Sequence, residues 1–129
     1  MSDTAAFRFS IQRLDAYTIE VEYAGYMPEK GEFIARTEAM VRASSAPVGI
    51  CYTVPDFTGF HRSQVQQHGD MFSRLGDLVT GIAVIEPRAV VRFGAITVGM
   101  ISNTPVKTFD QLAGAIEWLE SLRTESRRG

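Results

Sequence analysis

The side chains best suited to reaction chemistry are concentrated in residues 53–70, TVPDFTGFHRSQVQQHGD, which contain both histidines of the chain. Asp56, His61 and Ser63 could on paper form a hydrolytic triad, in which the imidazole accepts the hydroxyl proton and the carboxylate orients the imidazole. The stretch lacks the G-x-S-x-G elbow that exposes such a serine, and residues two apart on a helix do not face each other. Asp56 also suits a turn, PDFTG, where its carboxylate can bond its own backbone. We therefore predict that the chain is not an enzyme and has no catalytic residues.

The two histidines are also too far apart to share a metal ion on a helix. A helical metal pair needs a spacing near i, i+4, whereas His61 and His68 are seven positions apart, which is ~10 Å along a helix. Asp70 points elsewhere around that helix, and no other histidine or thiol cluster could complete a site. The sequence therefore predicts no metal and no cofactor. The simpler interpretation is a helix that begins at Ser63 and has a solvated face formed by Gln64, Gln66, Gln67 and Arg74.

Length and composition indicate a single globular domain. The chain has 129 residues, of which 45% are hydrophobic and 22% charged, as is typical of such domains. The net charge of −2 and the pI near 5.7 argue against nucleic acid as a partner, because phosphate binding needs a basic patch. We expect one domain over residues 1–129, with a core at about residues 7–122 and a frayed tail at residues 123–129.

The single cysteine and the distribution of apolar residues predict the cellular compartment. Cys51 lies in the apolar run VGICYTV and is expected to be a buried, inert thiol. Residues 1–10 have neither the basic nor the apolar region of a signal peptide, and no run reaches the ~18 apolar residues of a membrane span. These observations predict a cytoplasmic protein without a transmembrane segment.

Hydrophobic periodicity predicts strands that alternate with helices. Alternating apolar residues in residues 7–11 and in YTIEVEYAG predict a hairpin, and the continuous apolar runs VGICYTV and GIAVIE predict buried strands. Apolar residues at helical spacing predict four helices, in MPEKGEFIARTEAMVRASS, SQVQQHGDMFSRLGDL, residues 88–102 and TFDQLAGAIEWLESLR. PDFTGF is predicted to be a turn, and PVKTF a short strand. The order β-β-α-β-α-β-α-β-α predicts an α/β fold with one mixed sheet, in which parallel strands follow an N-terminal antiparallel hairpin.

The predicted helix over residues 88–102 is apolar nearly all round, so both of its sides should be covered. A sheet can cover only one side. The other side would meet a neighbouring helix, a second subunit, another protein or an apolar ligand. The loop at residues 55–63 is expected to form a second recognition surface. The candidate partner- or ligand-binding residues are Val91, Ala95, Val98, Met100, Phe57 and Phe60.

The element order and several motifs resemble STAS-like proteins, and more narrowly the SpoIIAA-like branch often labelled STAS/SEC14. The likeness lies mainly in RFGAITVGMISNTPVKTFDQLAGAIEWL, which contains the family's helix, its PV-strand-F-D element and its closing A-x-x-W-L helix. GYMPEKGEFIA resembles the family's Gly-ended strand and first helix. The resemblance extends over about residues 18–122. It implies helices mainly on one face of the mixed sheet and a role by contact rather than by chemistry, since such domains act as regulatory interaction modules and some relatives bind nucleotides or lipids.

The resemblance also gives one candidate modification site. In the phosphorylated antagonists of anti-sigma factors, a serine stands at the start of the second helix in an Asp-Ser-Ser-Gly-type motif. The matching segment here is FHRSQV, in which Ser63 falls near the modified position. His61 and Gln64 stand roughly where the motif has Asp and Gly, and Thr53 replaces the acidic residue at the end of the preceding strand.

These observations lead to two main hypotheses. The first is a non-catalytic, cytoplasmic STAS-like domain that works by contact with itself, as a homo-oligomer, or with another protein. The alternative is a carrier or sensor of a lipid or other small apolar molecule, held between the helix at residues 88–102 and the sheet. A third hypothesis, a hydrolase that uses Ser63 and His61, would require the triad geometry that the sequence does not support.

Overall fold

The computed structural model describes residues 6–86 and 88–128, in which strands and helices follow the predicted order. The strands are β1 (Arg8–Asp15), β2 (Thr18–Met27), β3 (Val48–Phe60), β4 (Val79–Ile85) and β5 (Val106–Phe109). The helices are α1 (Phe33–Arg42), α2 (Ser63–Leu75), α3 (Ala89–Ser102) and α4 (Leu112–Arg128), and a 3-10 turn, η1 (Gly76–Leu78), follows α2. The predicted order β-β-α-β-α-β-α-β-α is confirmed.

The strands form one mixed sheet in the order β1-β2-β3-β4-β5. β1 and β2 are antiparallel, and the pairs β2–β3, β3–β4 and β4–β5 are parallel. The hairpin is antiparallel because a short turn joins its strands, whereas each later strand returns through a helix that lets it run parallel to its predecessor. The predicted fold class is therefore confirmed.

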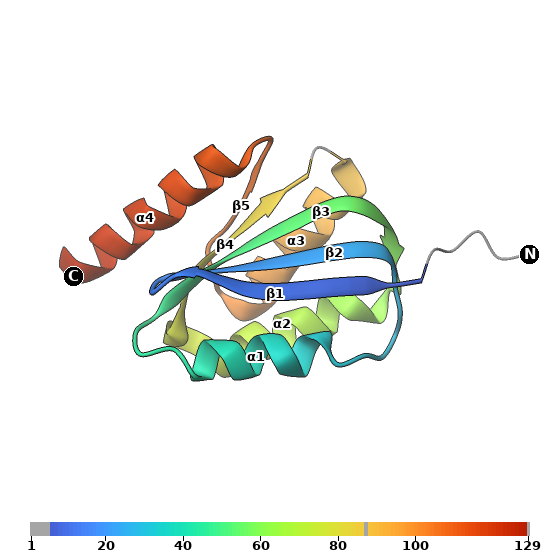
Figure 1. Ribbon diagram of the computed structural model, residues 1–129, viewed down its shortest axis with the longest axis horizontal. Coiled ribbons are helices and arrows are strands. Elements are labelled where there is room, and N and C mark those ends of the chain that lie inside the picture. Colours follow the sequence, from blue (N-terminus) through green and yellow to red (C-terminus); the bar gives the residue numbers. More distant parts are fainter. Residues whose placement is uncertain (1–5, 87, 129) are drawn as a thin grey trace, which may run out of the picture.

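Helices cover both faces of the sheet unequally. α1, α2 and α3 pack on one face, and α4 lies on the opposite face over β3, β4 and β5 (Figure 1). The main core lies under the first three helices, and a smaller one, formed by Cys51, Ala83, Ala115 and Leu119, lies under α4. α4 can approach closely because Gly49 has no side chain, and a Cβ there would lie 2.8 Å from Leu119 Cδ2. The expectation that most helices share one face is confirmed.

The predicted turn at residues 55–60 is wrong, because β3 continues through it to Phe60. Two register shifts against β2 absorb the residues that suggested a turn. Pro55 lies at the first shift, beyond the last pair with β4, so that its missing N–H breaks no bond in the ladder. Gly59 lies at the second shift with φ +151°, a conformation that favours glycine. The strand therefore projects past the end of β4 and brings its last residues over α2 and α3.

The start of the first helix also differs from the prediction, because α1 begins at Phe33 rather than in the segment around Pro28. α4 extends to Arg128, and the expected fraying of residues 123–129 stays a prediction. The Arg123 guanidinium stacks over the Tyr17 ring at 4.2 Å, which holds this part of α4 on the β1–β2 turn. Gly129 lies outside the described residues. Among the helices of residues 6–86 and 88–128, none combines the length and apolarity that crossing a membrane requires.

Candidate functional site

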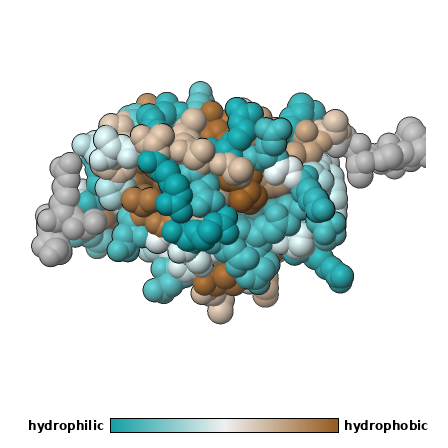
Figure 2. All heavy atoms as spheres, turned by 90° about the horizontal axis from the view of Figure 1, so that it is seen from below, coloured by the Kyte–Doolittle hydropathy of each residue, from teal (hydrophilic) through white to brown (hydrophobic). Residues whose placement is uncertain are grey.

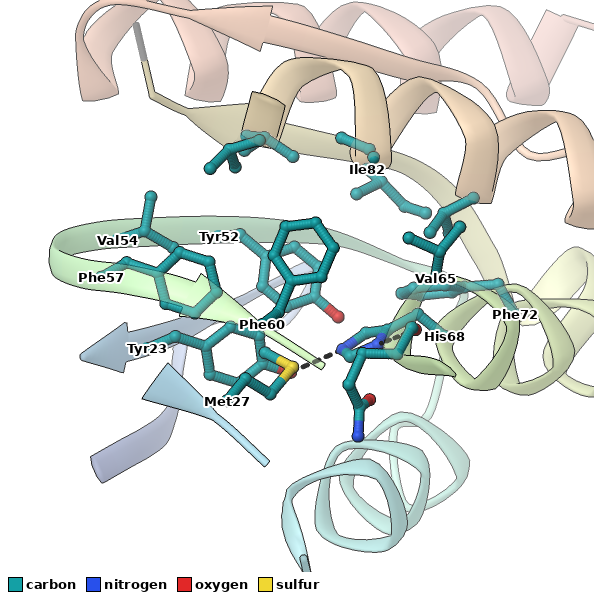
Figure 3. Close-up of a pocket in the computed structure, with 16 residues that line it drawn as sticks. Tyr23, Met27, Tyr52, Val54, Phe57, Phe60, Val65, His68, Phe72 and Ile82 are labelled. Carbon is teal, nitrogen blue, oxygen red and sulfur yellow. Dashed lines mark hydrogen bonds between the residues drawn. The ribbon is translucent and has the colours of Figure 1, made fainter. Parts of the chain in front are cut away.

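A cavity of about 100 Å³ lies between the sheet, α2 and α3. β2, β3 and β4, together with the facing side of α2, form its floor, and the projecting end of β3 forms one of its walls (Figure 3). Its half-buried residues come from β3, α2 and α3, so the opening lies where these three elements meet. The lining residues are Tyr23, Met27, Tyr52, Val54, Phe57, Phe60, Gln64, Val65, His68, Phe72, Ile82, Val84, Val91, Gly94, Ala95 and Val98.

The continuation of β3 positions the aromatic wall of this cavity. Phe57 and Phe60 stack with their ring centroids 6.1 Å apart and their planes 10° from parallel. Phe57 is buried, whereas Phe60 is half-buried near the opening. Phe60 can lie against α3 because Gly94 has no side chain, and a Cβ there would be 3.3 Å from Phe60 Cζ. The elongated strand thus forms a hydrophobic wall opposite α3.

A hydrogen-bonded histidine lies in the floor of the cavity. His68 Nδ1 is 2.8 Å from the Gln64 backbone oxygen, and His68 Nε2 is 2.9 Å from Tyr23 Oη. A carbonyl only accepts, so Nδ1 carries the proton and the Tyr23 hydroxyl donates to the bare Nε2. Burial lowers the pKa of His68 from 6.5 to about 4, against the opposing effect of the Gln64 carbonyl. The imidazole is therefore neutral at physiological pH.

Gln64 is fully buried and holds its amide in one orientation. Its Nε2 donates to the backbone oxygens of Pro28 at 2.8 Å and Glu29 at 3.1 Å, which uses both amide hydrogens. Its Oε1 is buried and has no hydrogen-bond partner in the described part of the chain. The expectation that Gln64 lies on the solvated face of α2 is wrong, because the loop after β2 packs over this turn of the helix and supplies two carbonyls.

Two tyrosines place their hydroxyls in the same floor. The rings of Tyr23 and Tyr52 are 5.4 Å apart between centroids, and both side chains are buried. Burial, and then the neighbouring Tyr52 hydroxyl, raises the pKa of Tyr23 well above 10. Burial likewise raises the pKa of Tyr52, partly offset by Tyr23. Tyr52 Oη is the second buried polar atom in the described residues with no hydrogen-bond partner of normal geometry.

An ion pair fixes the end of the cavity where β3 and α3 meet. The buried Glu86 carboxylate accepts hydrogen bonds from the Arg88 guanidinium and from its backbone N–H, and the Arg88 bonds are the main cause of the lowered pKa of Glu86. Arg88 also donates to the backbone oxygen of Phe57 at 2.5 Å. Arg92 donates to the Glu86 backbone oxygen at 2.6 Å and to Asp110 at 2.9 Å. These contacts tie the start of α3 to the projecting end of β3.

The outer face of α3 carries large apolar side chains that no other element within the described residues covers. Val90 is 66% exposed, Phe93 75%, Ile96 52% and Met100 78%. We call these four residues the outer stripe. They recur at i, i+3, i+6 and i+10, on one side of the helix, while Val91, Ala95 and Val98 face the cavity on the other. Figure 2 shows hydrophobic side chains gathered at the lower edge of a mostly hydrophilic view, on the side where α3 lies behind the sheet in Figure 1.

Of the three residues of the hypothetical triad, only His61 and Ser63 are within hydrogen-bond distance of each other. His61 Nδ1 lies 2.8 Å from Ser63 Oγ, and it also accepts the Ser63 backbone N–H at 3.1 Å. Ser63 Oγ receives a further hydrogen bond from Gln67 at 3.0 Å. Asp56 is exposed on β3, and no hydrogen bond or ion pair among the described residues joins it to either partner. The pair therefore lies at the start of α2, where Ser63, the candidate phosphorylation position, is half-buried.

The two histidines occupy different environments. His68 lies in the core with both ring nitrogens engaged, whereas His61 lies at the start of α2. Within residues 6–86 and 88–128 no three His, Cys, Asp or Glu side chains gather closely enough to hold a metal ion. Cys51 is fully buried, and burial raises the pKa of its thiol to about 12, as expected for an unreactive cysteine.

The candidate residues named from the sequence fall into two groups. Five of them line the cavity, whereas Met100 points outward as part of the outer stripe. The polar floor formed by Tyr23, Tyr52, Gln64 and His68 was not predicted from the sequence. A signal existed, because both tyrosines stand within apolar strand runs and His68 follows Gln64 by one helical turn. The five lining residues are Val91, Ala95, Val98, Phe57 and Phe60.

Comparison with known proteins identifies the fold. No protein-family model matches the sequence, and no curated protein matches it significantly. An uncharacterized protein of the DUF3478 family with a SpoIIAA-like fold, from Shewanella loihica PV-4, superposes with a TM-score of 0.69 at 14% identity, over 92% of this chain and 98% of that chain. The anti-sigma factor antagonist SpoIIAA in its unphosphorylated form superposes with a TM-score of 0.57 at 15% identity, over 88% of this chain and 97% of that chain. The fold is therefore SpoIIAA-like.

Proposed function

Because the chain has the SpoIIAA-like fold of STAS-type domains, we propose that it is a non-catalytic regulatory domain that acts by protein–protein contact in the cytoplasm. The contact surface is the outer stripe of α3, and its occupant is the same stripe of a second copy. The observation that carries this proposal is the exposure of four large apolar side chains on consecutive turns of one helix. SpoIIAA, an anti-sigma factor antagonist with this fold, is consistent with a role by contact.

The absence of charge on the outer stripe favours a second copy over other occupants. Arg92 is the only charged residue within α3, and its guanidinium is held by Glu86 and Asp110. A helix that binds an anionic membrane surface carries Lys and Arg beside its apolar face, which this helix does not. Aromatic and methionine side chains such as Phe93 and Met100 are enriched in protein interfaces, and a two-fold axis would place each stripe against an identical one.

The arrangement of reactive side chains supports a role without catalysis. His61 and Ser63 bond each other without a carboxylate partner, and the ring nitrogens of His68 are engaged in the core. The Cys51 thiol is buried beneath α4, away from the cavity. None of these groups combines a nucleophile, a base and an open site.

Sedimentation analysis tests the self-association proposal directly. The wild-type chain should form a dimer at micromolar to millimolar concentration, and Met100→Lys should weaken dimerisation at least tenfold, because burying a methionine contributes about 1.5–3 kcal/mol. Ser121→Lys, at an exposed position of α4, is the matched control and should leave dimerisation unchanged. A wild-type chain that remains monomeric throughout, or a Met100→Lys chain that dimerises as well as the control, would contradict the proposal.

A second candidate function is the binding of a lipid or other small apolar molecule in the cavity under α3. Its nearly continuous apolar lining favours this function. The two candidate functions use opposite sides of the same helix, so either can hold without the other.

A further inference from the structure

We propose that the cavity binds a small, neutral, apolar molecule whose polar end carries a hydrogen-bond donor, such as a phenol or an alcohol. This proposal rests on the second candidate function, because it names the chemical class that the cavity would take. It is independent of self-association through the outer stripe. The carrying observation is that two residues lining the cavity, Tyr52 and Gln64, each have a buried polar atom, Oη and Oε1, without a hydrogen-bond partner of normal geometry among the described residues.

The orientation of Gln64 requires a donor from the ligand. Its amide hydrogens are committed to the carbonyls of Pro28 and Glu29, so the amide cannot rotate to present N–H to the cavity without losing both bonds. The remaining Oε1 can only accept a hydrogen bond. A buried acceptor without a partner is unfavourable, and a ligand hydroxyl or N–H at this place would supply the missing hydrogen bond.

The pair formed by Tyr23 and Tyr52 also suits a ligand whose polar end can donate or accept a hydrogen bond. Tyr23 gives its proton to His68, so the free lone pairs of its oxygen can accept from the neighbouring Tyr52 hydroxyl. When Tyr52 donates in this direction, its own oxygen is left as an acceptor facing the cavity. When it rotates, it can donate instead to a ligand oxygen. A ligand hydroxyl, which both donates and accepts, can therefore form a hydrogen bond with Tyr52 in either arrangement.

The electrostatics of the cavity exclude an anionic ligand. None of the lining residues is charged at neutral pH, since the pKa of His68 is about 4 and both tyrosines titrate above their ordinary range. The cation at the adjoining end, Arg88, is already paired with Glu86. A carboxylate or phosphate would therefore enter an apolar site without a counter-charge, which is strongly unfavourable. Free fatty acids and phospholipid headgroups do not fit this site.

The size of the cavity limits the ligand to about one ring. An apolar cavity of roughly 150 Å³ accommodates benzene, and the volume here is about 100 Å³. The stacked rings of Phe57 and Phe60 provide an aromatic wall for such a ring. Because Phe60, Val91 and Ala95 are only half-buried, a short alkyl tail can extend through the opening. A substituted phenol with its hydroxyl in the polar floor meets each of these conditions.

Methyl-resolved NMR titration with a matched set of probes tests the proposal. The probes are 4-ethylphenol, which donates and accepts, 4-ethylanisole, which only accepts, ethylbenzene, which has no polar group, and 4-ethylbenzoate, which is anionic. We expect 4-ethylphenol to shift the methyl signals of Val54, Val84 and Val98. We expect 4-ethylanisole and ethylbenzene to bind about tenfold more weakly, the loss of roughly one hydrogen bond, and 4-ethylbenzoate not to bind.

Two variants link the binding to the cavity floor. Tyr52→Phe removes only a hydroxyl and keeps the packed ring, so the chain should fold normally, and its preference for 4-ethylphenol over ethylbenzene should fall severalfold. The matched control is Tyr26→Phe, which removes a hydroxyl from an exposed tyrosine outside the cavity and should retain the full preference. Ala95→Leu, which fills the cavity from α3, should abolish binding of all probes.

The outcomes separate this proposal from the function on which it rests. Equal affinity for 4-ethylphenol and ethylbenzene, or preferential binding of 4-ethylbenzoate, would refute the neutral donor class while leaving an apolar binding site. An unchanged preference in Tyr52→Phe would refute the assignment of the polar end to this floor. Failure of every probe to bind the folded wild-type chain would refute both, and would mean that only water meets the two unpartnered atoms.

Discussion

Acid should destabilise the protein through His68, and replacing this histidine should remove most of that effect. The folded chain binds the His68 proton at a pKa of about 4, whereas an unfolded chain binds it at 6.5. Between these two values the unfolded state therefore holds more protons than the folded state, so the free energy of unfolding rises with pH across this window. Integrating the difference from pH 7 to pH 5 gives a loss of about 2 kcal/mol from this single group.

The assay is urea unfolding followed by circular dichroism at pH 7, 6 and 5. Tyr23 and Tyr52 stay neutral over this range because burial raises the pKa of both. Glu38 and Glu86, whose pKa values are lowered below 4.5, contribute mainly at more acidic pH. The chosen window therefore isolates the imidazole from the other groups with shifted pKa values.

The comparison uses His68→Gln, which cannot titrate, and His61→Gln, which removes the other imidazole and keeps His68. His68→Gln should be less stable than the wild type at pH 7, because it disturbs the bonds to Tyr23 and to the Gln64 carbonyl. Its stability should nevertheless change about 2 kcal/mol less than the wild type between pH 7 and pH 5. His61→Gln should retain the full pH dependence. Equal pH dependence in His68→Gln and the wild type, or an NMR titration of His68 with a midpoint above 6, would refute the reasoning.

Three further substitutions test the packing and the ion pairs. Glu38→Gln removes the negative charge that pairs with Arg42 on α1 and Arg74 on α2, so it should lower the free energy of unfolding by up to about 1 kcal/mol in low salt and by less in high salt, measured by urea unfolding. Gly49→Val forces a side chain against Leu119 and should cost about 1–3 kcal/mol in the same assay; an unchanged midpoint would show that α4 moves freely. Val98→Asp places a charge at the cavity wall rather than on the outer stripe, so a thermal melt should show a strongly destabilised chain, and a normal melting temperature would contradict the assigned orientation of α3.

Which residues meet in the polar floor of the cavity depends on the tertiary structure. Residue types alone do not show that a tyrosine on β2, a tyrosine on β3 and a histidine on α2 meet at one point. Gln64 illustrates the difficulty, since a glutamine near a helix start is ordinarily solvated. It is buried here because the loop after β2, distant in sequence, lies over it and offers the carbonyls of Pro28 and Glu29.

The sequence by itself determined the alternation of strands and helices, and with it the mixed sheet. This information is local, because the periods of 2 and 3.6 residues report which side chains turn inward within one element. It also determined that residues 88–102 form a helix with more apolar surface than one sheet can cover. Only the tertiary structure decided which side of that helix is buried. Val91, Ala95 and Val98 face the cavity, and the outer stripe faces outward. It likewise decided that β3 continues to Phe60, because pairing with β2 outweighs the local turn preferences of Pro55 and Gly59. Such outcomes depend on contacts between segments far apart in the chain, which no local pattern records.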